Sequence, residues 1–234
     1  MNTKNDLIKS YRKVYEAFLK KDQISINDIK NSIDIFEKYP KIIPKKFEVI
    51  AIVSGLPFEI KFQKNIIKIQ SEIRNILGKT LHYFVKPDNL AVEYLVIKWP
   101  NDKYDLRTIL DIKTFLKDAK FKKFFFEIKG VQIHSDGCMV LQGFSENMEI
   151  NKYRKKIITN FPNLPKKQSD WSHIPIGRFV EPLNIIDKRK INNALKEINS
   201  NFTNFQTEIN SFHIVHEHRW YMEEFNKIYT KIFI

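Results

Sequence analysis

A turn dipeptide between two apolar stretches restricts the folds open to this chain. Residues 121–134, FKKFFFEIKGVQIH, and residues 138–144, CMVLQGF, are rich in the aromatic and β-branched side chains that favour strands. Asp136-Gly137 lies between them, and this dipeptide is typical of the tight turn of a β-hairpin. The hairpin predicts antiparallel pairing, so we expect an α+β fold and not a doubly wound parallel sheet.

The remaining periodic stretches interleave strands with helices. Strand patterns occur at residues 47–53, 90–97, 173–180 and 204–218, and in the tail from Trp220. Helical patterns run through Ile66 to Leu77 and cover residues 105–118, 147–160 and 187–199. Two more helices are expected in the first forty residues, ended by the prolines of YPKIIPKKF.

The charge balance favours a polyanionic partner. Lys and Arg outnumber Asp and Glu by 40 to 27, which gives a formal net charge of +13. Such an excess favours RNA, DNA or an anionic lipid surface. Abundant Lys also follows from AT-rich coding, so the charge alone leaves both interpretations open.

Cysteine usage and hydropathy indicate the compartment. The single Cys138 excludes an intrachain disulfide framework and a cysteine-based zinc cluster, which fits a reducing compartment. The sequence shows no signal-peptide pattern and no apolar run long enough to span a bilayer. We therefore expect a cytoplasmic protein that makes no membrane association.

Two stretches carry a resemblance to a known family. Residues 83–97 read YFVKPDNLAVEYLVI, and residues 171–179 read WSHIPIGRF. They resemble the two signatures of the two-histidine phosphoesterase superfamily, which contains bacterial 2'-5' RNA ligase-like proteins and cyclic phosphodiesterases. The separation of Ala91 from His173 is also similar to that between the family motifs. The resemblance covers residues 46–234 and leaves residues 1–45 as an N-terminal helical extension.

The resemblance implies a two-lobed α+β fold with antiparallel sheets related by a pseudo-two-fold axis. In the family, one histidine from each lobe transfers a proton on opposite sides of a phosphodiester, a task that suits the near-neutral pKa of imidazole. A hydroxyl two residues after each histidine contacts the phosphate. The implied ligand is RNA or a small nucleotide with a 2',3'-cyclic or 2'-5' linkage, bound in a basic cleft without a cofactor.

The sequence departs from the family pattern at both signatures. The first histidine position is Ala91 and its hydroxyl position is Glu93, whereas the second signature keeps His173 but has Pro175 for the hydroxyl. Arg178 stands at the family's terminal arginine. Three interpretations stay open: a protein that binds without cleaving, an enzyme that has recruited another acid or base, and a chain in which alanine has replaced the first histidine.

These matches assign roles to particular residues. We expect His173 to transfer one proton, with Glu93 or His216 as the second proton carrier. The residues expected to border the ligand are Ala91, Pro175, Arg178, Tyr83 and His218.

Other features of the sequence add weaker expectations. His134 is expected to be an exposed hairpin histidine. The pair His216 and His218 begins a metal-binding pattern, but no third ligand follows at defined spacing, so no metal is expected. A module that binds a protein partner through the N-terminal helices is the remaining alternative.

Overall fold

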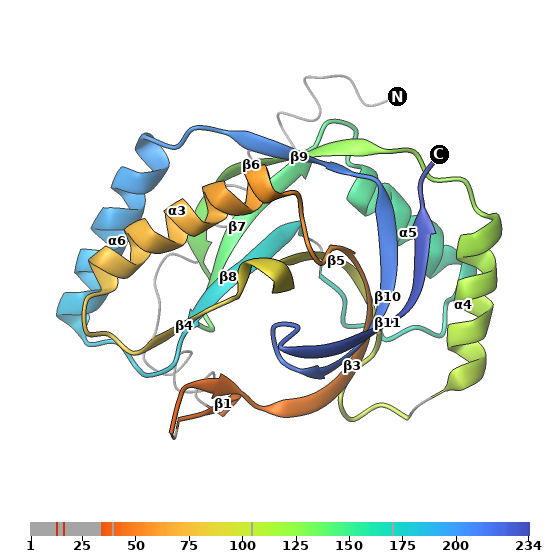
Figure 1. Ribbon diagram of the computed structural model, residues 1–234, viewed down its shortest axis with the longest axis horizontal. Helices are drawn as coiled ribbons and strands as arrows, with labels where there is room; N and C mark the ends of the chain where they lie inside the picture. The colour runs from red at the N-terminus through yellow and green to blue at the C-terminus, as the bar shows by residue number, and fades with distance from the viewer. Residues whose placement is uncertain (1–12, 14–15, 17–33, 39, 104, 170) are drawn as a thin grey trace.

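The computed structural model describes residues 13, 16, 34–38, 40–103, 105–169 and 171–234 (Figure 1). Two antiparallel sheets form the body of the molecule. The four-stranded sheet has the order β11 (Glu224–Ile232), β10 (Ser211–Arg219), β3 (Lys46–Gly55), β5 (Ala91–Lys98). The five-stranded sheet has the order β4 (His82–Phe84), β8 (His173–Phe179), β7 (Cys138–Ser145), β6 (Phe124–Ile133), β9 (Phe205–Ile209). The α+β, two-lobed architecture expected from the sequence is confirmed.

Four helices cover the described sheets, and two of them pack on the sheet that did not supply the preceding strand. Helix α3 (Ile60–Leu77) follows β3 but packs with α6 (Ile185–Ser200) and β9 beside the five-stranded sheet. Helix α5 (Glu149–Asn160) follows β7 but packs on β5, while α4 (Leu106–Asp118) lies against β11. The chain therefore passes repeatedly between the two lobes (Figure 1).

One aromatic cluster joins the end of the chain to the core of the four-stranded sheet. The ring of Phe212 on β10 lies 4.5 Å from that of Tyr94, 4.8 Å from that of Phe121 and 4.5 Å from that of Phe233, in edge-to-face arrangements. Such pairs stabilise beyond the area they bury. Phe233 is further held by a bond from its backbone N–H to the carbonyl oxygen of Asn210. Phe233 is thus part of the core.

The N-terminal region departs from its expected helical end. Phe36 lies in β1 (Phe36–Glu37), which pairs with β2 (Ile43–Pro44) in a two-stranded sheet, whereas the sequence pattern placed Phe36 on a helix. Its ring packs at 5.5 Å from Tyr83. The two expected helices lie largely outside the described residues, so the boundary between an extension over 1–45 and a domain over 46–234 stays a prediction.

One expected strand is two. Residues 204–218 form β9 in the five-stranded sheet and β10 in the four-stranded sheet, with a break at Asn210. The apolar alternation continues across the break because both halves are buried, and no glycine or proline marks it. This break carries the chain from one lobe to the other.

Among the described residues, no helix combines the length and the apolarity that crossing a lipid bilayer requires.

Candidate functional site

The first signature presents its key residues on one face of the four-stranded sheet. Glu93 on β5 and His213 on β10 both pair with Val53 on β3, and directly paired residues of an antiparallel sheet point to the same face. Ala91 lies two residues before Glu93 and shares this face. Glu217, four residues after His213, joins them in a regular part of the ladder.

The second signature presents its key residues on one face of the five-stranded sheet. His173 pairs with Gln142, and Pro175 pairs with Val140, two residues before Gln142 on β7. A register shift then leaves Ile176 as an extra residue, so that Arg178 pairs with Cys138 on the same face.

This β-bulge corrects simple alternation along β8. Strict alternation along the strand would put Phe179 on the same face as His173. Instead Phe179 is fully buried in the core, on the opposite face with Ile174 and Ile176. Arg178 takes the place beside His173 instead. Tyr83 on β4 pairs with Arg178, so it also lies on this face.

Side chains bridge the two faces. Strands β5 and β8 lie side by side (Figure 1). Arg154 of α5 donates to the carbonyl oxygen of Tyr94, to that of Glu93 at 3.3 Å and to that of Trp171 at 3.2 Å, and so connects β5 to the segment before β8. The hydroxyl of Tyr83 donates a hydrogen bond to the carboxylate of Glu223, in the turn between β10 and β11. The inter-sheet site is defined here by Arg154, which connects the two strands, and by the two faces: Ala91, Glu93 and Glu217 on one, and Tyr83, Gln142, His173, Pro175 and Arg178 on the other.

Burial controls protonation in the inter-sheet site. Burial, with smaller effects of the neighbouring His134 and Arg154, lowers the pKa of His173 to about 3. Burial raises the pKa of Glu217 to about 8, despite a hydrogen bond from the backbone N–H of Met222 at 2.9 Å. Burial also raises the pKa of Glu93, and Arg154 opposes that shift. At neutral pH the site therefore holds a neutral imidazole and at least one protonated carboxyl group.

His134 is not an exposed hairpin histidine. Its ring centroid lies 5.2 Å from that of His173 and 5.9 Å from that of Trp171, both in edge-to-face arrangements. The turn residue Asp136 accepts a hydrogen bond from Arg178. The hairpin that fixes the fold class thus also contributes to the inter-sheet site.

The structure places His216 and His218 away from the inter-sheet site. His216 precedes Glu217 on β10 and pairs with Ile50 on β3. Neighbouring residues of a strand point to opposite faces, so His216 points away from the face that holds Glu217. His218, two residues on, shares that face. This placement corrects the expectation that His216 transfers a proton and that His218 borders the ligand: neither is brought to Glu93 and His173.

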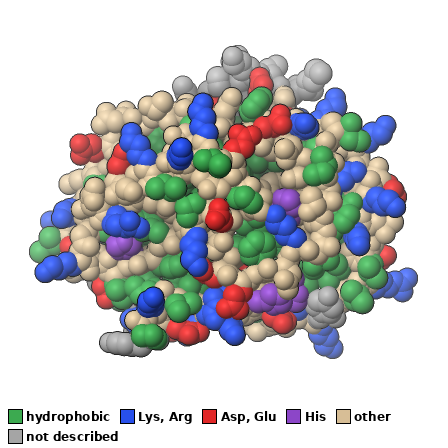
Figure 2. All heavy atoms as spheres, in the orientation of Figure 1, with side chains coloured by type: hydrophobic (Ala, Val, Ile, Leu, Met, Phe, Trp, Pro, Cys, Tyr) green, Lys and Arg blue, Asp and Glu red, His purple; other side chains and the backbone are tan. Residues whose placement is uncertain are grey.

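Basic side chains are not gathered at one place on the visible surface. Figure 2 shows Lys and Arg scattered over this face of the molecule, among acidic and apolar side chains. A groove of about 1120 Å³ lies between α3, α6 and β9, lined by Phe62, Ile69, Ile198 and Phe205 among others. It contains none of the residues of the inter-sheet site, so size alone does not locate the chemistry.

The fold is similar to that of solved phosphoesterase structures, as the resemblance to the two-histidine phosphoesterases implied. The solved structures most useful for comparison are TT0787 of Thermus thermophilus and LigT of E. coli in its apo form. TT0787 has a TM-score of 0.54 and 11% identity, covering 79% of this chain and 97% of its own. LigT has a TM-score of 0.51 and 7% identity, covering 81% of this chain and 99% of its own.

A crystal structure described only as a phosphoesterase is similar to the same extent, with a TM-score of 0.56 and 8% identity over 80% of this chain and 98% of its own. No protein-family model matches the sequence, and no curated protein matches it. At these identities the similarity is one of fold.

Several residues of the inter-sheet site were not identified from the sequence. Gln142 belongs to it only because β7 pairs with β8 in this register, and Arg154 only because α5 packs on the other lobe. Glu217 could have been found from the sequence. Alternation along the strand places it on the same face as His213 and on the face opposite His216.

Proposed function

We propose that the inter-sheet site binds the phosphate of a nucleotide or of an RNA end, and that it does so without two-histidine hydrolysis. Three buried side-chain atoms support binding: Nδ1 of His173, Nε2 of Gln142 and Nε of Arg178 have no hydrogen-bond partner within the described part of the chain. Buried polar atoms are normally paired, so such a group indicates a ligand. Two of the three atoms are N–H donors, which suits the acceptor oxygens of a phosphate.

The loss of hydrolysis follows from the residues that face each other. In-line displacement at phosphorus needs a base on the attacking oxygen and an acid on the leaving oxygen. His173 supplies one imidazole, while the methyl group of Ala91 at the matching position transfers no proton. A pKa of about 3 also makes His173 a weak base at neutral pH. A crystal structure of E. coli LigT in complex with 3'-AMP, which is similar to this chain in fold, supports a nucleotide ligand.

The acidic residues do not prevent anion binding at neutral pH. With a pKa of about 8, Glu217 carries a proton there, and the pKa of Glu93 is raised as well. A protonated carboxyl group donates a hydrogen bond to a phosphate oxygen, whereas a carboxylate repels it.

A phosphodiesterase of altered mechanism is the second candidate, and Glu93 is the residue that favours it. Its raised pKa suits a general acid, and it comes from the sheet facing His173. Turnover separates the two candidates.

The test measures binding and turnover on the full-length chain. Calorimetry would use 3'-AMP, 2',3'-cyclic AMP and a short 2'-5' oligoadenylate, with each also incubated for cleavage. We expect binding without turnover, and at least about tenfold weaker binding in His173→Ala and Gln142→Leu, since each removes a hydrogen bond to a charged group. Gln206→Leu, at an exposed position of β9, is the matched control and should bind as the unmodified protein does.

Two outcomes count against this proposal. Failure of all three ligands to bind would remove it. Turnover that disappears in His173→Ala and in Glu93→Gln would replace it by the second candidate. The Ala91→His variant adds a further check, since turnover gained there alone would show that the first histidine is the missing catalytic group.

A further inference from the structure

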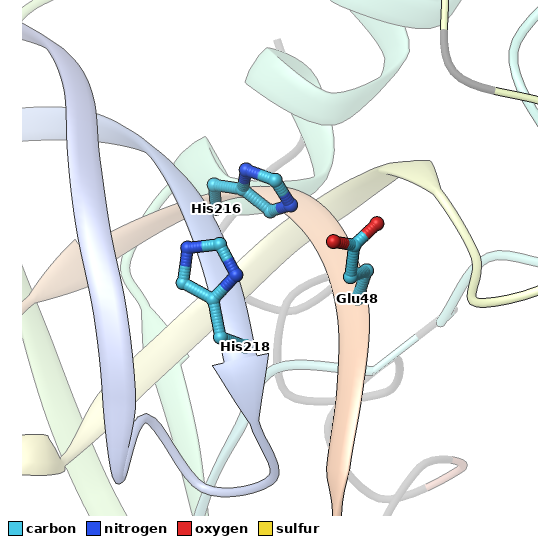
Figure 3. Close-up of side chains that lie close together, drawn as sticks. All are labelled: Glu48, His216 and His218. Carbon is cyan, nitrogen blue, oxygen red and sulfur yellow. The ribbon is translucent and has the colours of Figure 1, made fainter.

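Three side chains that can bind a metal ion lie together on the face of the four-stranded sheet opposite Glu93 and Glu217 (Figure 3). Glu48 comes from β3, and His216 and His218 come from β10. One ligand atom of each, a carboxylate oxygen or an imidazole nitrogen, lies within 4.8 Å of the other two. We propose that this cluster binds a divalent transition-metal ion of the zinc type.

Strand geometry explains why these residues meet. His216 and His218 are two residues apart on β10, so both rings project from the same face, with centroids 4.1 Å apart. Glu217 pairs with Val49, and Glu48 precedes Val49, which brings its side chain out beside the two imidazoles. The sequence pattern gave two ligands; the neighbouring strand supplies the third.

The donor set suits zinc. Two imidazoles and one carboxylate occur together in catalytic zinc sites, where bonds of about 2.0–2.2 Å in a tetrahedral arrangement put ligand atoms roughly 3.3 Å apart. Because the three atoms already lie within 4.8 Å, modest rotation of side chains brings them to that spacing. Three protein ligands leave the fourth position of a tetrahedral ion for water. Glu48 is exposed and both histidines are partly exposed, so solvent reaches the cluster.

A neighbouring side chain can orient one of the two imidazoles for binding. Nδ2 of Asn226 on β11 lies 3.1 Å from Nε2 of His218. A half-turn of this amide would bring its oxygen there instead, where it would accept the Nε2–H and leave Nδ1 of His218 for the metal.

One charged group opposes the ion. The ammonium of Lys98 on β5 is held near the cluster by the carbonyl oxygens of Trp99 at 3.2 Å and Pro100 at 3.4 Å. The carboxylate of Glu48 offsets this positive charge, so removing that carboxylate should weaken the binding of a cation.

The experiment titrates Zn²⁺ into the full chain, purified with a chelator and dialysed into a non-coordinating buffer, and follows heat and stoichiometry. Absorption spectra with Co²⁺ report the coordination geometry. We expect one ion per chain and a tetrahedral cobalt spectrum. Binding should weaken by at least about tenfold in His218→Ala, His216→Ala and Glu48→Gln, and by about tenfold in Asn226→Ala, which removes only the partner of a ligand.

The controls separate this site from other histidines. His82→Ala, on β4 in the other sheet, removes a histidine outside the cluster and should leave zinc affinity unchanged. Circular dichroism of each metal-free variant checks that it folds. Zinc binding that survives all three ligand variants overturns the proposal, and binding that is lost in His173→Ala instead assigns the ion to the inter-sheet site. No measurable binding at micromolar zinc also overturns it.

Discussion

Glu217 is a carboxyl group held where its charged form is disfavoured. It is 7% exposed and lies on the same face as Glu93, whose charge adds to the effect of burial on its pKa. Only the backbone N–H groups of Met222 and Tyr221 oppose this shift. A residue with these properties stabilises the fold while protonated and destabilises it once ionised.

Replacing Glu217 by Gln should therefore change how stability depends on pH. The pKa is raised from about 4.5 in the unfolded chain to about 8 in the fold, so the unfolded state loses its proton first and stability falls as pH rises between these values. Glutamine keeps the acceptor for Met222 and carries no charge. At about pH 9 we expect Glu217→Gln to be about 1–3 kcal/mol more stable in urea unfolding, with little gain below about pH 4.5.

Glu146→Gln, at an exposed position after β7, serves as the control and should show no such pH-dependent gain. If the Glu217 variant and the unmodified protein are equally stable across this pH range, the fold does not raise the pKa of Glu217.

Residues next to a motif were identified from the sequence, and residues that depend on register were not. His173, Glu93 and Arg178 stand at fixed offsets within the two signatures, and they reach the inter-sheet site. Alternation along β10 separates His216 from His213 and Glu217. Which of these two faces looks toward the other sheet depends on how the lobes pack, and no local pattern contains that information.

Arg154 joins elements of both lobes through backbone carbonyl groups. Arg154 is only 6% exposed. Its guanidinium donates hydrogen bonds to carbonyl oxygens on β5 and to the carbonyl oxygen of Trp171, just before β8. These acceptors lie where the two lobes meet, and the oxygen of Trp171 also accepts a hydrogen bond from the hydroxyl of Ser169 at 3.1 Å. The fork geometry of arginine satisfies several at once, which the single ammonium of lysine does not.

Arg154→Met should lower the free energy of unfolding by at least about 3 kcal/mol, because it removes several hydrogen bonds that a buried charged group donates to backbone carbonyl oxygens. Arg154→Lys should recover only part of this loss. Chemical denaturation at neutral pH measures both. Lys155→Met, one residue on and exposed on the same helix, should change stability by less than about 0.5 kcal/mol. A similar small effect at both positions would show that water replaces the arginine.

Helices with a clear periodic pattern were located well from the sequence. A very short strand, and a break within a continuous apolar pattern, were not. The patterns over residues 105–118 and 187–199 lie within one or two residues of α4 and α6. Strand β4 is three residues long, too short for a period to appear, and it was missed. The passage from β9 to β10 was missed because Ile209 and Phe212 are buried on either side of it, so the apolar pattern shows no interruption.

The net charge of +13 belongs to the whole molecule and not to the inter-sheet site. That site contains Arg178 and Arg154, but it also contains carboxyl groups, and Arg178 is paired with Asp136. Figure 2 shows basic side chains distributed around the visible face. Attraction of polyanions and recognition of a single phosphate are therefore separable properties of this protein.

Salt should separate them experimentally. We expect binding of a random RNA, measured by fluorescence anisotropy, to weaken by about 10³-fold or more between about 50 and 200 mM salt, because many counterions are released. Binding of 3'-AMP should weaken far less over that range, since one phosphate is involved. Identical salt dependence for both ligands would contradict this separation. His173→Ala should weaken only the nucleotide, which provides the internal control.

The crossing of the chain between lobes has a consequence for how a ligand enters. Helices α3 and α5 each leave a strand of one sheet and pack with the other, so several chain segments tie the lobes together. Proteins that close around a ligand by domain rotation concentrate the motion in a few hinge residues. Within the described part of this chain several segments cross between the halves, and all of these crossings would have to bend at once. Ligand exchange is therefore expected through loops at the mouth of a rigid site, and a protein cut into two fragments at any one loop should retain its shape only while both pieces remain associated.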